Sequence, residues 1–170
     1  QQSRNYGAFG RFDWDGEIGG KRADAFFGAW YRTGDMDSNF YVNVRGGRGA
    51  PTSRTLQNAK AFDVFGEGRL FVTDQVAVVA GATWGQAKRD YTSFAIPGVA
   101  STFNLKADKS YDWVSPRIGL LWQNEVGDQV FANLTRSVEP PNFGSMSPTN
   151  TGFAPVKSQK AWTGEVGEIG

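Results

Sequence analysis

The chain has 170 residues, no cysteine, no histidine and a formal net charge of +1. Without cysteine there are no disulfides or thiolate metal sites, and without histidine the commonest general base and metal ligand is missing. The near-neutral charge gives no indication of nucleic acid as a partner. Twenty-two glycines and 14% aromatic residues favour many short strands over helices. No apolar run reaches the roughly 20 residues of a membrane helix, whereas a β-barrel crosses with alternating segments of about ten residues.

Alternation of apolar and polar residues predicts two antiparallel strand pairs in the first half of the chain. Each pair closes around a short turn, at residues 16–20 and 73–75. The polar segment between the pairs, Thr33–Asn58, is interpreted as a long loop with a flexible glycine-rich tip at residues 46–49. The four predicted strands are Asn5–Asp15, Lys21–Arg32, Ala59–Val72 and Val76–Lys88.

The second half repeats this unit. A second long loop, Arg89–Lys109, leads into a hairpin with a turn at residues 124–128. A third long segment rich in Pro, Asn, Ser and Gly, Glu139–Pro155, follows before alternation resumes. The three strands predicted here are Asp112–Gln123, Gln129–Ser137 and a last one within Lys157–Gly170.

Short and long connections therefore alternate along the chain. Compact domains rarely carry several structureless loops of about twenty residues, whereas outer-membrane barrels combine short turns on one rim with long loops on the other. We predict an all-β fold, an antiparallel up-and-down meander of about seven strands that forms part of a transmembrane β-barrel. The alternative is a soluble β-sandwich with decorated loops, such as a lectin-like module that binds through loop aromatics.

The aromatic residues favour the barrel. Trp14 and Trp122 lie at the turn ends of their strands, and Tyr31, Trp84 and Trp162 at the loop ends, as two interfacial girdles require. Trp30 and Trp113 have the opposite parity, which predicts packed, inward positions. Parity does not reveal which face is convex. The face opposite the apolar one carries charged residues, namely Arg11, Asp13, Arg22, Asp24, Asp63, Glu67, Arg69, Arg117 and Glu165.

Four segments, in this order, resemble the C-terminal barrel of TonB-dependent outer-membrane receptors. FDVFGEGRL (62–70) with VAGATW (79–84) is similar to a family hairpin, although Gly81-Ala82-Thr83 replaces the usual Gly-Leu-Arg. WVSPRIGLLW (113–122), VFANLTRSVEPPNF (130–143) and KSQKAWTGEVG (157–167) resemble the segments that follow. The resemblance covers Ala59–Gly170 well and the first 58 residues loosely.

This resemblance implies that residues 1–170 form a partial barrel domain, an internal piece of a complete barrel of about 22 strands. No segment resembles the plug domain, the TonB box or a terminal strand with a final aromatic residue. The implied function is active transport across the bacterial outer membrane of a ferric siderophore or other small chelate, energised by the TonB complex through the plug. The barrel is expected to contact outer-membrane lipid, and nucleic acid is not an expected partner.

Enzymatic activity, a cofactor and a metal site are not expected. No histidine partners the serines or carboxylates, and no GxSxG segment is present. Carboxylate pairs such as Asp13 with Asp15 or Asp35 with Asp37 are interpreted as solvated charges. The glycine-rich tip lacks the lysine of a phosphate-binding loop.

Three arginines are the candidate ligand-binding residues. Arg45, Arg48 and Arg54 lie within ten residues of one another in the predicted loop Thr33–Asn58. The planar guanidinium donates paired, charge-assisted hydrogen bonds that suit carboxylate and catecholate oxygens. Glycines between Arg45 and Arg48 would let the backbone close around a ligand. The alternative is a loop kept soluble by its charges.

Overall fold

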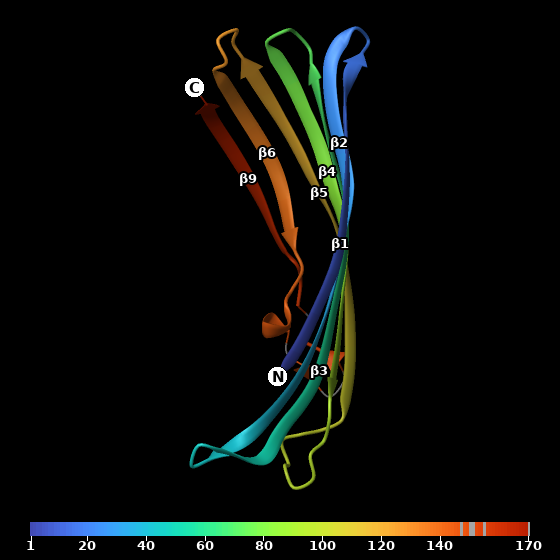
Figure 1. The fold of residues 1–170 in the computed structure, drawn as a ribbon, viewed down its shortest axis with the longest axis vertical. Helices are drawn as coiled ribbons and strands as arrows, with labels where there is room; N and C mark the ends of the chain where they lie inside the picture. Colours follow the sequence, from blue (N-terminus) through green and yellow to red (C-terminus); the bar gives the residue numbers. More distant parts are fainter. Residues whose placement is uncertain (147, 150–151, 155, 170) are drawn as a thin grey trace.

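Seven long strands form one antiparallel sheet in which each strand pairs only with its neighbours along the chain (Figure 1). The computed structural model describes residues 1–146, 148–149, 152–154 and 156–169. This topology confirms the predicted all-β meander. The strands are β1 (Gln2–Ile18), β2 (Lys21–Val44), β3 (Gly47–Phe71), β4 (Val76–Ser93), β5 (Leu105–Gln123), β6 (Gln129–Glu139) and β9 (Gln159–Ile169).

The β-sandwich alternative is wrong, because no second layer covers either face in the described ranges. The other sheet consists only of β7 (Pro148–Thr149) and β8 (Gly152–Phe153), two residues each. The helical content of the described residues is one 3-10 turn, η1 (Phe143–Ser145). Within the same ranges, no helix is long and apolar enough to cross a membrane.

The predicted long loop Thr33–Asn58 is wrong, because both halves of it continue the strands. β2 runs on to Val44 and β3 starts at Gly47, which leaves Arg45 and Gly46 as a two-residue turn. Both turn residues have positive φ, 52° and 84°, as a type I′ hairpin turn requires. We call this protruding β2–β3 hairpin the wing; beyond Tyr31 it extends β2 by thirteen residues, about 43 Å of strand.

The other two long connections differ from each other. Between β4 and β5 the connection shrinks to residues 94–104, because β4 extends to Ser93 and β5 begins at Leu105. Thr102 fixes this loop, since its hydroxyl accepts from the backbone N–H of Ile96 at 2.8 Å and donates to the carbonyl of Val99 at 2.8 Å. The connection from β6 to β9 keeps its predicted length, and Pro155 lies outside the described residues.

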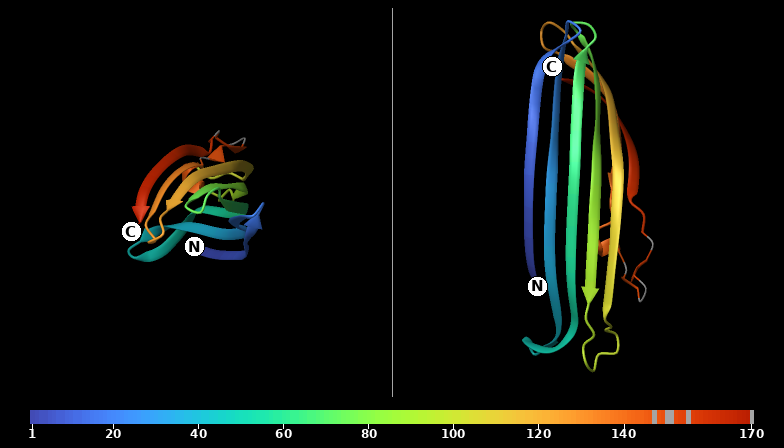
Figure 2. Two further views of the ribbon diagram at one scale, coloured as in Figure 1. Left: turned by 90° about the horizontal axis from the view of Figure 1, so that it is seen from above. Right: turned by 90° about the vertical axis from the view of Figure 1, so that its right-hand side faces the viewer.

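Three short turns lie at the opposite end from the wing (Figure 2, right). The first is shorter than predicted, because β1 continues to Ile18 and only Gly19 and Gly20 turn, with φ of 61° and 74°. The turn predicted at 73–75 spans residues 72–75, because β3 ends at Phe71, and the turn at 124–128 matches its prediction. Asn124 builds the latter, since its Oδ1 accepts from the backbone N–H groups of residues 126, 127 and 128 at 2.7–2.9 Å.

The sheet is curved and twisted (Figure 2). Its two faces are packed differently. A row of cross-strand partners, Phe71, Ala77, Leu121 and Phe131, forms the buried cluster. Ala87 and Tyr111, also cross-strand partners, are buried on the same face farther along. Apart from Ala23, the buried side chains of the strands thus gather on one face, while the large apolar side chains of the other remain exposed.

Candidate functional site on the polar face

Strand parity sorts the side chains into an apolar face and a polar face. The apolar face presents large hydrophobic groups to the surroundings, with Phe27 62% and Ile118 56% exposed. Soluble monomers rarely expose so continuous an apolar surface, so this face requires an apolar partner such as lipid. Its exposed members include Tyr6, Phe12, Trp14, Ile18, Phe27, Tyr31, Phe62, Val64, Trp84, Val114, Ile118, Leu120, Trp122, Val130, Leu134, Trp162 and Val166.

Two pairs of girdle aromatics give the tilt of the strands. Trp14 is in register with Ile118 through β2, β3 and β4, and Trp122 lies four residues nearer to the short turns. Tyr31 is in register with Gln86, and Trp84 lies two residues nearer to the turns, over two strand steps. In both pairs the level of the aromatic residues therefore shifts by one residue per strand. A shift of about 3.3 Å along a strand for each 4.8 Å between strands corresponds to a tilt of about 35°. Membrane barrels have this tilt.

The polar face carries three ion pairs that join different strands: two link the neighbours β2 and β3, and the third links β3 to β5 across Gly81. Asp24 accepts from Arg69 Nε at 2.8 Å, Glu67 lies 3.0 Å from Arg117, and Asp63 lies 3.4 Å from Arg32. The side chains of all three pairs are partly exposed, so each pair contributes well under about 1 kcal/mol. The predicted grouping of these charges opposite the apolar face is confirmed.

Aromatic rings lie among these charges. Phe9 packs edge-on against Trp30 with ring centroids 5.8 Å apart and stacks on Phe65 at 6.0 Å, and Phe65 contacts Phe26. Trp30 and Trp113 both lie on the polar face, opposite the apolar one, as their parity predicted. The predicted packing holds only for Trp113, which is half-buried; Trp30 remains 46% exposed.

A hollow of about 510 Å³ lies beside Trp30, on the wing side of the aromatic group. Arg32 and Arg89 line it, and Gly7 and Gly34 form part of its floor. Arg89 lies five residues beyond the girdle residue Trp84, outside the apolar band. Burial lowers the pKa of Arg89 below its ordinary value and the nearby charge of Arg32 lowers it further, while Tyr111 opposes both effects.

The three predicted arginines lie on the wing and make separate contacts. Arg45 occupies the tip turn with positive φ, and the adjacent glycines close this tight turn rather than a flexible loop. The guanidinium of Arg48 lies 4.6 Å from the ring centre of Tyr41, and that of Arg54 4.8 Å from the ring centre of Phe94. Their role in ligand binding stays a prediction.

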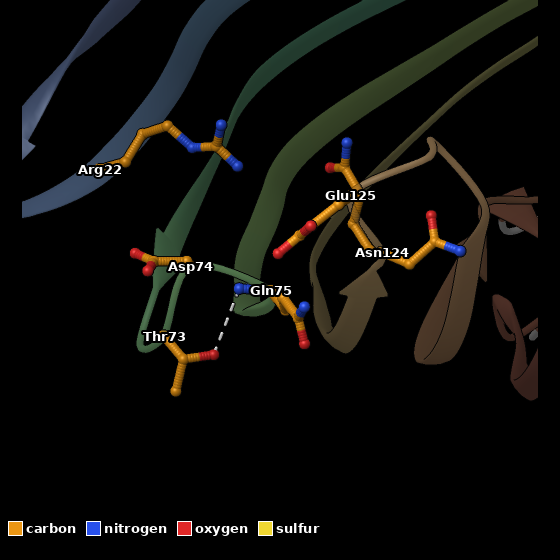
Figure 3. A pocket seen from close by; sticks show the side chains of 7 residues that line it. Arg22, Thr73, Asp74, Gln75, Asn124 and Glu125 are labelled. Atoms are coloured by element: carbon orange, nitrogen blue, oxygen red, sulfur yellow. Dashed lines mark hydrogen bonds between the residues drawn. The ribbon is translucent and has the colours of Figure 1, made fainter.

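A second hollow, about 490 Å³, lies at the rim formed by the short turns (Figure 3). Arg22, Asp74 and Glu125 are among its lining residues. Several of its polar atoms serve the turns: Thr73 Oγ1 accepts from the backbone N–H groups of Gln75 and Val76 at 3.3 and 3.0 Å. We interpret this rim as a structural feature rather than a ligand site. The described residues contain no cluster of three or more metal-ligating side chains.

The β6–β9 connection contacts the polar face near the wing. Tyr111 donates a long hydrogen bond of 3.4 Å to the carbonyl of Val156, and Tyr91 packs edge-on against Phe153 with centroids 5.9 Å apart. Burial raises the pKa of both tyrosines, with the charge of Arg89 opposing the rise at Tyr111. This connection therefore contributes side chains to the same side of the sheet as the arginine-lined hollow.

That Arg32 and Arg89 line the same hollow was not predicted from the sequence. Parity placed Trp30 opposite the apolar face, but Arg89 was interpreted as the start of a loop. The register of β2, β3 and β4 brings the two arginines to neighbouring levels, since Arg32 pairs with Ala61 and Arg89 with Ala59. The only available signal was the continuation of alternation past Lys88.

Comparison with known proteins gives one family. The model described as TonB dependent receptor-like, beta-barrel, matches residues 1–167. No curated protein matches the chain.

Proposed function

The chain belongs to the β-barrel part of the TonB dependent receptor-like family, and on this premise we propose that it forms part of the wall of an outer-membrane active transporter. The family is one of receptors and transporters of the Gram-negative outer membrane rather than of enzymes. The single observation that supports the proposal is the division of one sheet into a lipid-suited apolar face and a charged face. A tilted wall of this kind separates lipid from a water-filled interior.

The transported ligand is proposed to be a ferric siderophore or another small chelate. An anionic chelate that is too large for passive pores fits a receptor whose wing and polar face present arginines. Arg45, Arg48 and Arg54 are proposed to contact the ligand first, because they lie where the wing extends beyond the paired ends of β1 and β4, opposite the short turns (Figure 1). Energy is proposed to come from the TonB complex, acting through a plug domain of the parent receptor.

Uptake in cells tests the transport proposal. The parent gene is deleted, and accumulation of radiolabelled ferric chelates is measured in the deletion strain, the complemented strain and a complemented strain that lacks TonB. We expect accumulation of at least one chelate only in the complemented strain with TonB. Equal accumulation of every chelate tested in all three strains would contradict the proposal.

A further inference from the structure

The arginine-lined hollow has an excess of positive charge. Arg32 and Arg89 face it, and Lys109, the register partner of Arg89 on β5, adds a third cation on the polar face. Asp63 is the one carboxylate that pairs with this group, and it contacts only Arg32, at 3.4 Å. Within the described ranges no acidic side chain pairs with Arg89. Three cations and one carboxylate give this group a net positive charge that a bound anion can neutralise.

The guanidinium of Arg89 is held in place with donors to spare. Its Nη1 donates to the backbone carbonyls of Lys60 at 3.3 Å and Lys88 at 3.1 Å. These bonds fix the orientation of the group, while Nε and Nη2 have no hydrogen-bond partner among the described residues. A guanidinium fixed in this way loses less entropy when it binds an anion. Burial lowers the pKa of Arg89, and the neighbouring charge of Arg32 lowers it further against the opposing effect of Tyr111.

Trp30 gives the hollow a flat, apolar wall. Its indole lies next to Gly7, where an added Cβ would be 3.8 Å from Nε1 and 3.0 Å from the carbonyl oxygen of Tyr31. Glycine at position 7 keeps the floor beside the indole low, whereas the side chain of Asn5 lies over Gly34. The indole is 46% exposed, and its N–H makes no hydrogen bond within the part of the chain that the structure describes. An exposed indole beside cations suits a ligand that carries a ring.

We propose that this hollow binds the anionic group of a ligand that also carries a planar ring, with Arg32 and Arg89 donating to the anion and Trp30 stacking on the ring. The inference rests on the transport function proposed above and adds a subsite on the polar face, distinct from the three wing arginines. A volume of about 510 Å³ accommodates a ring with its substituents. Carboxylate and phosphate share the chemistry that a guanidinium recognises, so the test includes both.

Titration of the purified full-length receptor in detergent tests the site. The probes are benzoate, which has a ring and a carboxylate, inorganic phosphate, and benzyl alcohol, which has the ring without the charge. Calorimetry is carried out on the natural protein and on R32Q, R89Q and W30L. R117Q is the matched control, because Arg117 lies on the same face and pairs with Glu67 at 3.0 Å.

We expect benzoate to bind more tightly than phosphate, and benzyl alcohol not to bind. Loss of either arginine should weaken benzoate and phosphate by about tenfold or more, as expected for the loss of a charge-assisted hydrogen bond. W30L should weaken benzoate alone, and R117Q should leave both unchanged. Unchanged affinity in R32Q and R89Q, or an equal loss in R117Q, would overturn the proposal. If R89Q does not fold, R89K replaces it in the test. This variant keeps the charge but lacks the planar guanidinium with its paired donors, and it should still bind benzoate and phosphate more weakly.

The two proposals fail in different ways. Normal ferric-chelate uptake by cells, together with no benzoate or phosphate binding by the purified receptor, contradicts the subsite and leaves the transport function standing. Arginine-dependent benzoate binding without chelate uptake contradicts the transport function and supports the subsite.

Discussion

The indole of Trp113 occupies the space above Gly85, its register partner on the neighbouring strand. A Cβ built on Gly85 would overlap Cζ2 and Cε2 of the indole, and it would lie 2.5 Å from Oδ1 of Asp63. Gly85 is buried, although no second layer covers the sheet within the described ranges. An aromatic side chain that covers a cross-strand glycine in this way stabilises a sheet at a position where glycine alone weakens it.

Replacing Gly85 with alanine should therefore destabilise the sheet. The rigid indole of Trp113 must move to admit the methyl group, at a cost of about 1–3 kcal/mol. Urea unfolding of the full chain in detergent measures this change in the free energy of unfolding. Gly164→Ala is the matched control, because nothing lies within 4 Å of a Cβ at Gly164. Equal stability of the two variants would contradict the packing described for Trp113.

A charge in the middle of the apolar face should be costly. Ile118 lies midway between the two girdles on β5, so Ile118→Arg should lower the free energy of unfolding in membranes by about 2–4 kcal/mol. Asn133→Arg is the control on the polar face, where Glu165 is the register partner and can accept the new charge. Heat-modifiable migration after insertion into bilayers reports the folded fraction. A larger loss for Asn133→Arg would show that the faces are inverted.

The sequence predicted strands where the two faces differ in polarity and missed them where both faces are polar. Residues 33–44 and 47–58 form the wing, yet they lack alternation, and Pro51 and the glycines of residues 46–49 are typical of loops. In the structure, Pro51 pairs with Tyr41, with a register shift on either side, where a missing N–H is tolerated. The hollow lined by Arg32 and Arg89 was not predicted for a related reason, since only the register of three strands brings these residues together.

Changing Arg45, Arg48 and Arg54 together to alanine should weaken binding of an anionic ferric chelate to the full-length receptor. Three charged donors are removed from the wing, and the loss should be about tenfold or more. Titration of the chelate measures it, with Lys88, Lys106 and Lys160 changed to alanine as a control of equal charge. An unchanged affinity would remove these arginines from the ligand site and leave the transport proposal intact.

The folded chain should lose stability at alkaline pH partly through Tyr111. Burial raises the pKa of its hydroxyl, so the unfolded chain releases the proton first, near pH 10. Stability from this group is present below about pH 10 and is lost as the pH rises through the raised pKa. Tyr111→Phe should flatten this decline by up to about 1.4 kcal/mol per pH unit.

The pH dependence of urea unfolding checks this expectation. Tyr6→Phe is the control, because Tyr6 lies exposed on the apolar face, 62% accessible. A decline of the same slope in Tyr111→Phe and in the natural chain would contradict the contribution of Tyr111.

Pairing of each strand only with its sequence neighbours has a kinetic consequence. The β1–β2, β2–β3, β3–β4 and β5–β6 hairpins close loops of two to five residues, so each can nucleate early at a low entropic cost. The β4–β5 pair closes residues 94–104, and β9 reaches β6 only across the nineteen residues between Glu139 and Gln159. We therefore expect the meander to assemble from its hairpins, with β9 docking last of these strands.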